Sequence, residues 1–162
     1  MDQAQQTKAA GFLMGLTYAA GALGIGLAFS TLSSATPDLR WGCLFAVGVA
    51  GVLSYVRHSI MHRGDAARMG WDMGRTNPFQ IEVGLANLAW GILAIVAVAL
   101  SWGLAVYSAC FLVFGFYMAG VTGFKALWAS KGHPEEWRAV VPAGVFAALL
   151  IVIGAGGMSA LP

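Results

Sequence analysis

The stretch PFQIEVGLANLAWGILAIVAVAL at residues 78–100 decides the fold class of this chain. It is followed by Ser101-Trp102-Gly103 and by a second apolar run, LAVYSACFLVFGFYMAGVTGFKAL, at residues 104–127. A helix needs about 20 apolar residues to cross the hydrocarbon core of a bilayer, and a helix satisfies its own backbone hydrogen bonds in lipid. Each run therefore predicts a transmembrane helix, and the tight turn between them predicts an antiparallel pair.

Three further apolar runs have a comparable length, at about residues 9–32, 41–56 and 139–158. Hydrophobic residues make up 59% of the 162-residue chain and charged residues 10%, whereas a soluble domain carries about 25% charged residues. We therefore predict an all-α integral membrane bundle of five transmembrane helices, forming a single domain over residues 1–162.

The basic residues predict the orientation of this bundle. Cytoplasmic loops of membrane proteins carry an excess of Lys and Arg. With five spans, the side that holds Arg40 has no other basic residue, and the N-terminal side has Lys8, Arg57, Arg63, Arg68, Arg75, Lys125, Lys131 and Arg138. We expect the protein in the cytoplasmic (inner) membrane, with the N-terminus inside and the C-terminus outside.

The start of the third span is marked by Asn77, a good N-cap, and by Pro78, which suits the first helical turn. Gln80 follows Asn77 at the spacing of a capping box. Glu82 then lies about one turn inside the span, where a carboxylate is usually functional or paired. Two partners for it are considered: the positive end of its own helix, and Lys125 of the adjacent span. Lys125 could instead extend to the headgroups.

Polar side chains gather at the predicted cytoplasmic boundary, and we expect any ligand to bind there. The candidate ligand-binding residues are Tyr55, His58, His62, Gln80, Glu82 and Lys125. His58 and His62 are four residues apart, so with Glu82 they could form a two-histidine, one-carboxylate metal set. The alternative is a pair of histidines at a wet helix end. We predict no cofactor, with a divalent metal as the alternative.

The loop at residues 63–76 carries the other polar stretch. Asp65 is interpreted as the cap of a short helix. Arg68 and Arg75 are expected to meet anionic lipid headgroups at the cytoplasmic face, while Met69, Trp71 and Met73 enter the interface. A substrate lid is the alternative.

Small residues predict where the helices pack. Gln80, Gly84, Asn87 and Gly91 form a stripe at helical spacing, which favours a helix–helix contact. We also expect close packing at Gly11, Gly15, Gly120 and Gly123. Cys43 and Cys110 lie in apolar runs and are interpreted as buried free thiols.

One signature resembles a known family. Gly70-Trp71, Pro78-Phe79-Gln80, Glu82-Val83-Gly84 and Ala86-Asn87 resemble the GW…PFQxEVGxAN pattern of an uncharacterised family of small bacterial and archaeal multi-span membrane proteins. The resemblance implies a helical membrane bundle and no known activity.

Two classes of function follow. The net charge of +2 and the lack of a basic tail do not indicate nucleic acid binding. We predict a non-catalytic helical membrane module or small-ligand binder, in contact with the lipid bilayer. The alternative is a metal- or small-molecule-dependent membrane enzyme or carrier that uses the His/Glu/Lys cluster. A homo-oligomer or a subunit of a membrane complex is left open.

Overall fold

The computed structural model describes residues 2–70, 74–133 and 137–162. Within these residues, five helical segments are long and apolar enough to cross a membrane: Gln3–Leu32, Arg40–Ile60, Pro78–Ala99, Leu104–Ser130 and Trp137–Ser159. The first and the last three are the helices α1, α5, α6 and α7. The predicted all-α membrane bundle is thus confirmed, with helix ends within a few residues of those expected for most spans.

The second span is one continuous helix in which α-helical and π-helical segments alternate. It runs through α2 (Arg40–Cys43), η1 (Leu44–Val49), α3 (Ala50–Tyr55) and η2 (Val56–Ile60), and a short helix α4 (His62–Arg68) follows. The two η segments are π-helical: the Ala50 N–H donates to the Phe45 carbonyl in the first, and the Met61 N–H donates to the Val56 carbonyl at 2.9 Å in the second. The last π turn lies beyond the predicted end of the span.

The second span and α5 approach so closely that side chains would not fit between them. A Cβ atom on Gly51 would lie 2.7 Å from the Asn87 carbonyl oxygen and 2.9 Å from the Gly91 Cα. Gly84 similarly faces Ser59, whose hydroxyl donates to the Ile81 carbonyl at 2.9 Å. The predicted contact stripe on α5 is therefore confirmed.

The packing role expected of Gly15, Gly120 and Gly123 is wrong. Within the described residues, a Cβ on any of the three would meet no atom within 4 Å, so they face no other described helix. A Cβ on Gly11 would reach Arg68 Cδ of α4 at 4.0 Å, which is ordinary contact with a side chain and no close approach of backbones.

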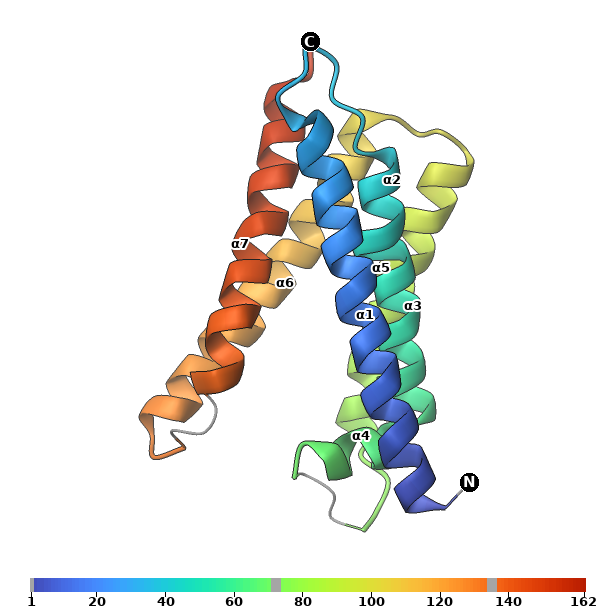
Figure 1. The fold of residues 1–162 in the computed structure, drawn as a ribbon, viewed down its shortest axis with the longest axis vertical. Helices are drawn as coiled ribbons and strands as arrows, with labels where there is room; N and C mark the ends of the chain where they lie inside the picture. The colour runs from blue at the N-terminus through green and yellow to red at the C-terminus, as the bar shows by residue number, and fades with distance from the viewer. Residues whose placement is uncertain (1, 71–73, 134–136) are drawn as a thin grey trace.

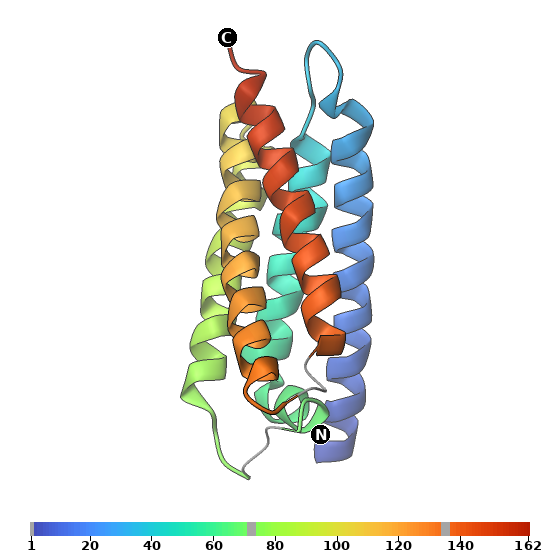
Figure 2. The same ribbon diagram turned by 90° about the vertical axis from the view of Figure 1, so that its left-hand side faces the viewer.

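Helices α6 and α7 form a close antiparallel hairpin (Figures 1 and 2). The hairpin leans away from α1 and α5 toward the end of the bundle that holds the N-terminus (Figure 1). It joins the other helices through a core that includes Leu39, Val47, Phe111, Leu150 and Ile153. On α5, the Trp90 ring lies 4.8 Å from that of Tyr117 on α6.

The turn between α5 and α6 is as tight as predicted. Ser101 and Gly103 both have positive φ, 52° and 93°, and the Trp102 N–H donates to the Ala97 carbonyl at 2.9 Å. Positive φ is accessible to glycine at little cost and is uncommon for other residues. This turn forces α5 and α6 to run antiparallel.

Candidate functional site

The polar centre of the molecule is Asp65, a residue of α4. This helix tucks against α1, where Gly64 comes so close to Gln6 that a Cβ would lie 2.5 Å from the Gln6 backbone carbon. The approach places Asp65 beneath the second span and α5, with no exposed surface. An isolated buried carboxylate is costly unless it is paired and hydrogen-bonded.

Four side chains surround the Asp65 carboxylate. Arg68 donates from Nε and Nη2 to Oδ1 at 3.3 and 3.2 Å. His58 Nδ1 lies 2.8 Å from Oδ2, and Gln80 Nε2 donates to Oδ2 at 3.0 Å. Arg57 Nη1 is 3.9 Å from Oδ1. We call these five residues the Asp65 cluster: Arg57, His58, Asp65, Arg68 and Gln80.

The hydrogen bond between Arg57 and His58 sets the tautomer of the imidazole. Arg57 Nη2 lies 2.9 Å from His58 Nε2. A guanidinium only donates, so Nε2 is the acceptor and the proton is on Nδ1, which faces Asp65. His58 therefore lies between the two charged groups as a neutral imidazole. Its Nε2 accepts from Arg57, and its Nδ1–H faces Asp65 Oδ2.

Asp65 is held as an anion. Burial by itself raises the pKa of its carboxyl, but the close contact with His58 Nδ1 and the charges of Arg57 and Arg68 outweigh it, and the pKa lies below the ordinary value of 3.8. A carboxylate that stays ionised at neutral pH serves as a fixed counterion.

The cluster carries more positive than negative charge, because two guanidinium groups share one carboxylate. The side chains of Arg57 and Arg68 are 12% and 25% exposed. Within the part of the chain that the structure describes, three buried atoms of the cluster have no hydrogen-bond partner: Arg57 Nε, His58 Nδ1 and Gln80 Oε1. His58 Nδ1 nevertheless lies 2.8 Å from Asp65 Oδ2. The arrangement can therefore bind an anion, and Arg57 Nε and Gln80 Oε1 are a donor and an acceptor that no described residue uses.

A comparison with protein families matches residues 8–153 to a family described as "Family of unknown function (DUF6790)". The match covers most of the chain. The chain belongs to this family. No curated protein and no solved structure matches it. Membership agrees with the expected uncharacterised family, while the GW…PFQxEVGxAN pattern as its signature stays a prediction.

In this DUF6790 chain, two of the six predicted ligand-binding residues lie together, since His58 and Gln80 both contact Asp65. The Nδ1 atom of His62 instead lies 3.0 Å from the Ser59 carbonyl oxygen. Tyr55 is half-buried and Glu82 is exposed, while Lys125 is engaged in an interaction of its own. Their part in ligand binding stays a prediction.

The predicted metal set is not brought together. Within residues 2–70, 74–133 and 137–162, no three His, Cys, Asp or Glu side chains are grouped so that they could hold a metal ion. His58, His62 and Glu82 are therefore not arranged as ligands of one ion. Nor do the ion pairs found in this part of the chain include one between Glu82 and Lys125.

Two expectations for the loop and the start of α5 need correction. Asp65 does not cap α4, because it lies inside the first turn and Met61 is the N-cap residue. Asn77 caps α5 as predicted, accepting from the Gln80 N–H at 3.2 Å, but the Gln80 side chain binds Asp65 instead of closing a capping box. Arg68 donates to Asp65, and its expected contact with anionic headgroups stays a prediction. Trp71 and Met73 lie outside the described residues.

Asp65 is the functional candidate that sequence reasoning missed. The available signal was its spacing from Arg68, since side chains three residues apart on a helix are neighbours. The contacts with Arg57, His58 and Gln80 depend on how α4 folds back against α1, which no local pattern encodes.

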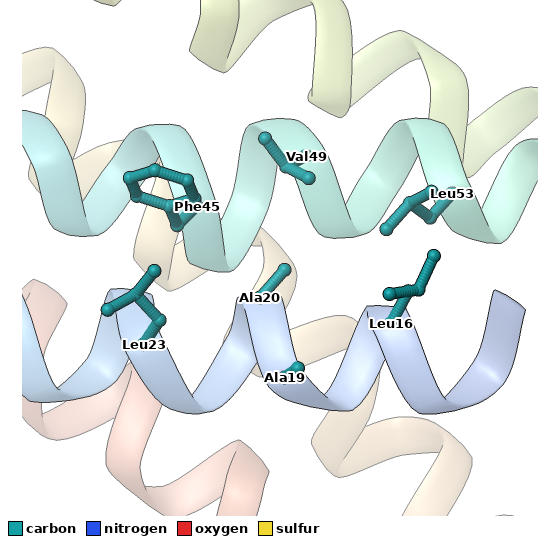
Figure 3. A pocket seen from close by; sticks show the side chains of 7 residues that line it. All are labelled: Leu16, Ala19, Ala20, Leu23, Phe45, Val49 and Leu53. Carbon is teal, nitrogen blue, oxygen red and sulfur yellow. The ribbon is translucent and has the colours of Figure 1, made fainter. Parts of the chain in front are cut away.

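A shallow groove of about 390 Å³ lies on another face, between α1 and the second span (Figure 3). Its lining is entirely apolar: Leu16, Ala19, Ala20, Leu23, Phe45, Val49 and Leu53. No polar group is present there to orient a ligand, so this groove suits lipid chains and does not compete with the Asp65 cluster as a site.

Proposed function

We propose that this protein is a non-catalytic membrane module that binds a phosphate-bearing anion, the headgroup of an anionic lipid, at the Asp65 cluster. The observation that carries the proposal is the convergence of Arg57, Arg68 and His58 on the single carboxylate of Asp65. The pair of guanidinium groups exceeds the charge of that carboxylate.

Arginine suits such a ligand, because its planar fork of N–H donors matches phosphate oxygens. Arg68 donates to Asp65 through Nε and one terminal nitrogen, and its side chain remains a quarter exposed. A phosphate oxygen next to this exposed part would complete the charge balance of the cluster.

The position of the cluster along the membrane normal favours a lipid headgroup, and not a lipid tail, as the bound group. Arg57 and His58 lie in the last turn of the second span, and Asp65 and Arg68 lie on the helix just beyond it. That is the level of the membrane interface, where basic groups attract anionic lipids.

The role of Asp65 supports binding over catalysis. Its pKa is lowered and its oxygens accept from Arg68 and Gln80, beside His58. A general acid or base needs a pKa near the working pH, whereas this carboxylate is fixed in its ionised form.

Native mass spectrometry of the protein released from detergent tests this proposal. We expect phosphatidylglycerol to be retained in preference to phosphatidylcholine. Arg68→Gln should lower that retention by roughly tenfold, because a hydrogen bond to a charged group contributes about 1.5–3 kcal/mol and 1.4 kcal/mol is a factor of ten. Arg138→Gln is the matched control, because it removes an exposed basic residue at the start of α7.

Adding either of two soluble phosphates to the lipid-bound protein distinguishes a lipid headgroup from a soluble phosphate ligand. Inorganic phosphate and glycerol phosphate should not displace the lipid at equal concentration if the headgroup binds together with its tails. Displacement by either would identify a soluble phosphate ligand. Equal loss of lipid in Arg68→Gln and Arg138→Gln would reduce the effect to general electrostatics and contradict a specific site.

We further propose that this end of the bundle faces the cytoplasm of a bacterial inner membrane. Two observations support this orientation. Basic residues are in excess on the loops and helix ends at the N-terminal side of the spans, and the Asp65 cluster lies on that same side.

A further inference from the structure

The guanidinium of Arg57 is held by a single hydrogen bond. Its Nη2 donates to His58 Nε2 at 2.9 Å, and within the described residues it makes no other hydrogen bond. Its Nη1 is 3.9 Å from Asp65 Oδ1, which is an ion pair but too long for a hydrogen bond. Arg68, by contrast, donates twice to the same oxygen. The position of Arg57 therefore depends on whether His58 can accept a hydrogen bond.

Protonation of His58 removes that acceptor. Nδ1 already carries the proton that faces Asp65 Oδ2 at 2.8 Å, so a second proton adds at Nε2. An imidazolium has two donors and no acceptor. Its new N–H would point at the N–H groups of Arg57, and two positive charges would lie side by side. The contact with Asp65 survives this change, whereas the hydrogen bond to Arg57 does not.

The charges around His58 come from two helical segments. Arg57 belongs to the same π-helical segment, and Asp65 and Arg68 belong to α4. From α5, Gln80 contributes a neutral amide. In mild acid the arginines stay charged and Asp65 stays ionised, because its pKa lies below 3.8. His58 is therefore the member of the cluster that changes its charge near neutral pH.

Two phenols on other helices act on the charge of Arg57: Tyr18 of α1 and Tyr117 of α6. Tyrosine does not ionise in mild acid, so neither phenol changes its charge in this range. The His58 side chain is 17% exposed, and it lies in the last turn of the second span. Protons from the aqueous side can therefore reach it.

We propose that protonation of His58 releases Arg57 to the phosphate of the bound lipid, so that the Asp65 cluster holds an anionic lipid more tightly in mild acid. The inference rests on the function proposed above. Two guanidinium groups and one carboxylate give the cluster a charge of +1 while His58 is neutral, and the imidazolium brings it to +2. The release of Arg57 and the higher charge act in the same direction.

Lipid retention measured at two pH values by native mass spectrometry tests this inference. Phosphatidylglycerol is the probe, because its phosphodiester stays singly charged in mild acid, and phosphatidylcholine is the reference. Between pH about 7.5 and about 5.5 an ordinary imidazole changes from mostly neutral to mostly charged. We expect the preference of the wild type for phosphatidylglycerol to rise roughly fivefold, since one hydrogen bond to a charged group contributes about tenfold when fully formed.

Three variants identify the groups responsible. His58→Gln should abolish the rise, because an amide can accept from Arg57 and donate to Asp65 but does not titrate. Arg57→Gln should flatten the pH profile as well, because it has no guanidinium to release. His62→Gln is the matched control and should keep the rise, since the His62 imidazole contacts the Ser59 carbonyl and not the cluster.

The contrary outcomes can be told apart. A preference for phosphatidylglycerol that does not change with pH would overturn this inference and leave the proposed function intact, whereas no preference at either pH would contradict the proposed function itself. A full rise in His58→Gln would assign the effect to another group. A full rise in Arg57→Gln would show that the charge of His58 acts without any release of Arg57.

Nitrogen NMR of the protein with isotope-labelled histidine gives a measurement that does not depend on whether the variants at residues 57 and 58 fold. At pH about 7.5 we expect neutral His58 to carry its proton on Nδ1, and Nε2 should gain a second proton as the pH falls. The chain has three histidines, so spectra of His62→Gln and His133→Gln assign the signal of His58. A proton on Nε2 of the neutral ring would overturn the proposal, because Arg57 would then have no acceptor to lose.

Discussion

Asp65 shows how a single carboxylate can organise the end of a membrane bundle. Alone in the interior it would be strongly destabilising, but Arg57, Arg68 and Gln80 supply donors from three different helical segments. Each of these side chains would in turn be poorly satisfied without it. The cluster therefore ties the second span, α4 and α5 together through charge as well as shape.

We predict that Asp65→Asn lowers the free energy of unfolding by about 3 kcal/mol, since removal of one partner of a buried ion pair leaves the other charge uncompensated. Unfolding of the purified protein in detergent measures the change. Glu82→Gln is the control, because Glu82 is an exposed carboxylate on α5 at the same end. If both substitutions lowered the free energy of unfolding equally, the buried ion pairs of Asp65 would contribute no more to stability than an exposed carboxylate does.

The stabilisation from Asp65 should depend on pH with a defined sign. The pKa of Asp65 is lower in the folded protein than its ordinary value of 3.8, so the unfolded state binds its proton first as the pH falls. The contribution is complete well above 3.8 and is lost as the pH falls through the folded pKa. The difference in unfolding temperature between wild type and Asp65→Asn should be constant near neutral pH and should narrow in acid below that value. If the difference in unfolding temperature narrowed at about pH 6 to 7 instead, the pH dependence would be assigned to a histidine.

The sequence predicted part of this cluster for physical reasons that are clear in the structure. His58 and Gln80 stood out because polar side chains at the end of a span need partners. Asp65 did not, because a carboxylate in a loop has water as its default partner. Its burial arises from Gly64, whose missing side chain lets α4 lie against the backbone of Gln6. That approach is tertiary and leaves no periodic pattern.

At the level of elements, the backbones of the second span and α5 lie close together, so glycines between them should tolerate alanine far less well than glycines elsewhere. We predict that Gly51→Ala destabilises the protein by roughly 1–3 kcal/mol, the cost of overpacking, because the new Cβ would meet the Asn87 carbonyl and the Gly91 Cα. Gly123→Ala on α6 should be neutral or stabilising by up to about 1 kcal/mol, since alanine favours helix and no atom lies within 4 Å. Unfolding temperatures of both variants measure this. A neutral Gly51→Ala would mean that the two helices separate easily.

The helices themselves were predictable because length and apolarity are local properties, whereas their contacts were only partly so. The stripe ending at Gly91 was identified correctly, since amide and small residues shared one face of α5. Gly120 and Gly123 are equally small, but no described atom lies within 4 Å of a Cβ placed on either of them. The π-helical turn that carries Arg57 and His58 had no sequence signal, because its winding is set by what the side chains contact.

Over the whole molecule, the Asp65 cluster lies away from the closest packing of the α6–α7 hairpin. The cluster includes α4, at the end of the bundle that holds the N-terminus (Figure 1). The hairpin diverges from the other helices toward that same end (Figure 1). The proposed site is therefore built by the second span, α4 and α5, without residues of the hairpin.

The orientation of these ends gives the last prediction. A reporter that is active only in the cytoplasm should be active when fused after Gly74 or after Gly132, and silent when fused after Pro162. The first two positions follow α4 and α6 on the basic side of the spans, and the third follows α7 on the side that holds Arg40 alone. Basic residues near span ends resist translocation, so we expect the N-terminal side to stay inside. The reverse pattern would place the Asp65 cluster outside the cell, away from the anionic leaflet that its arginines are proposed to contact. Equal activity after Gly132 and Pro162 would mean that α7 does not cross the bilayer.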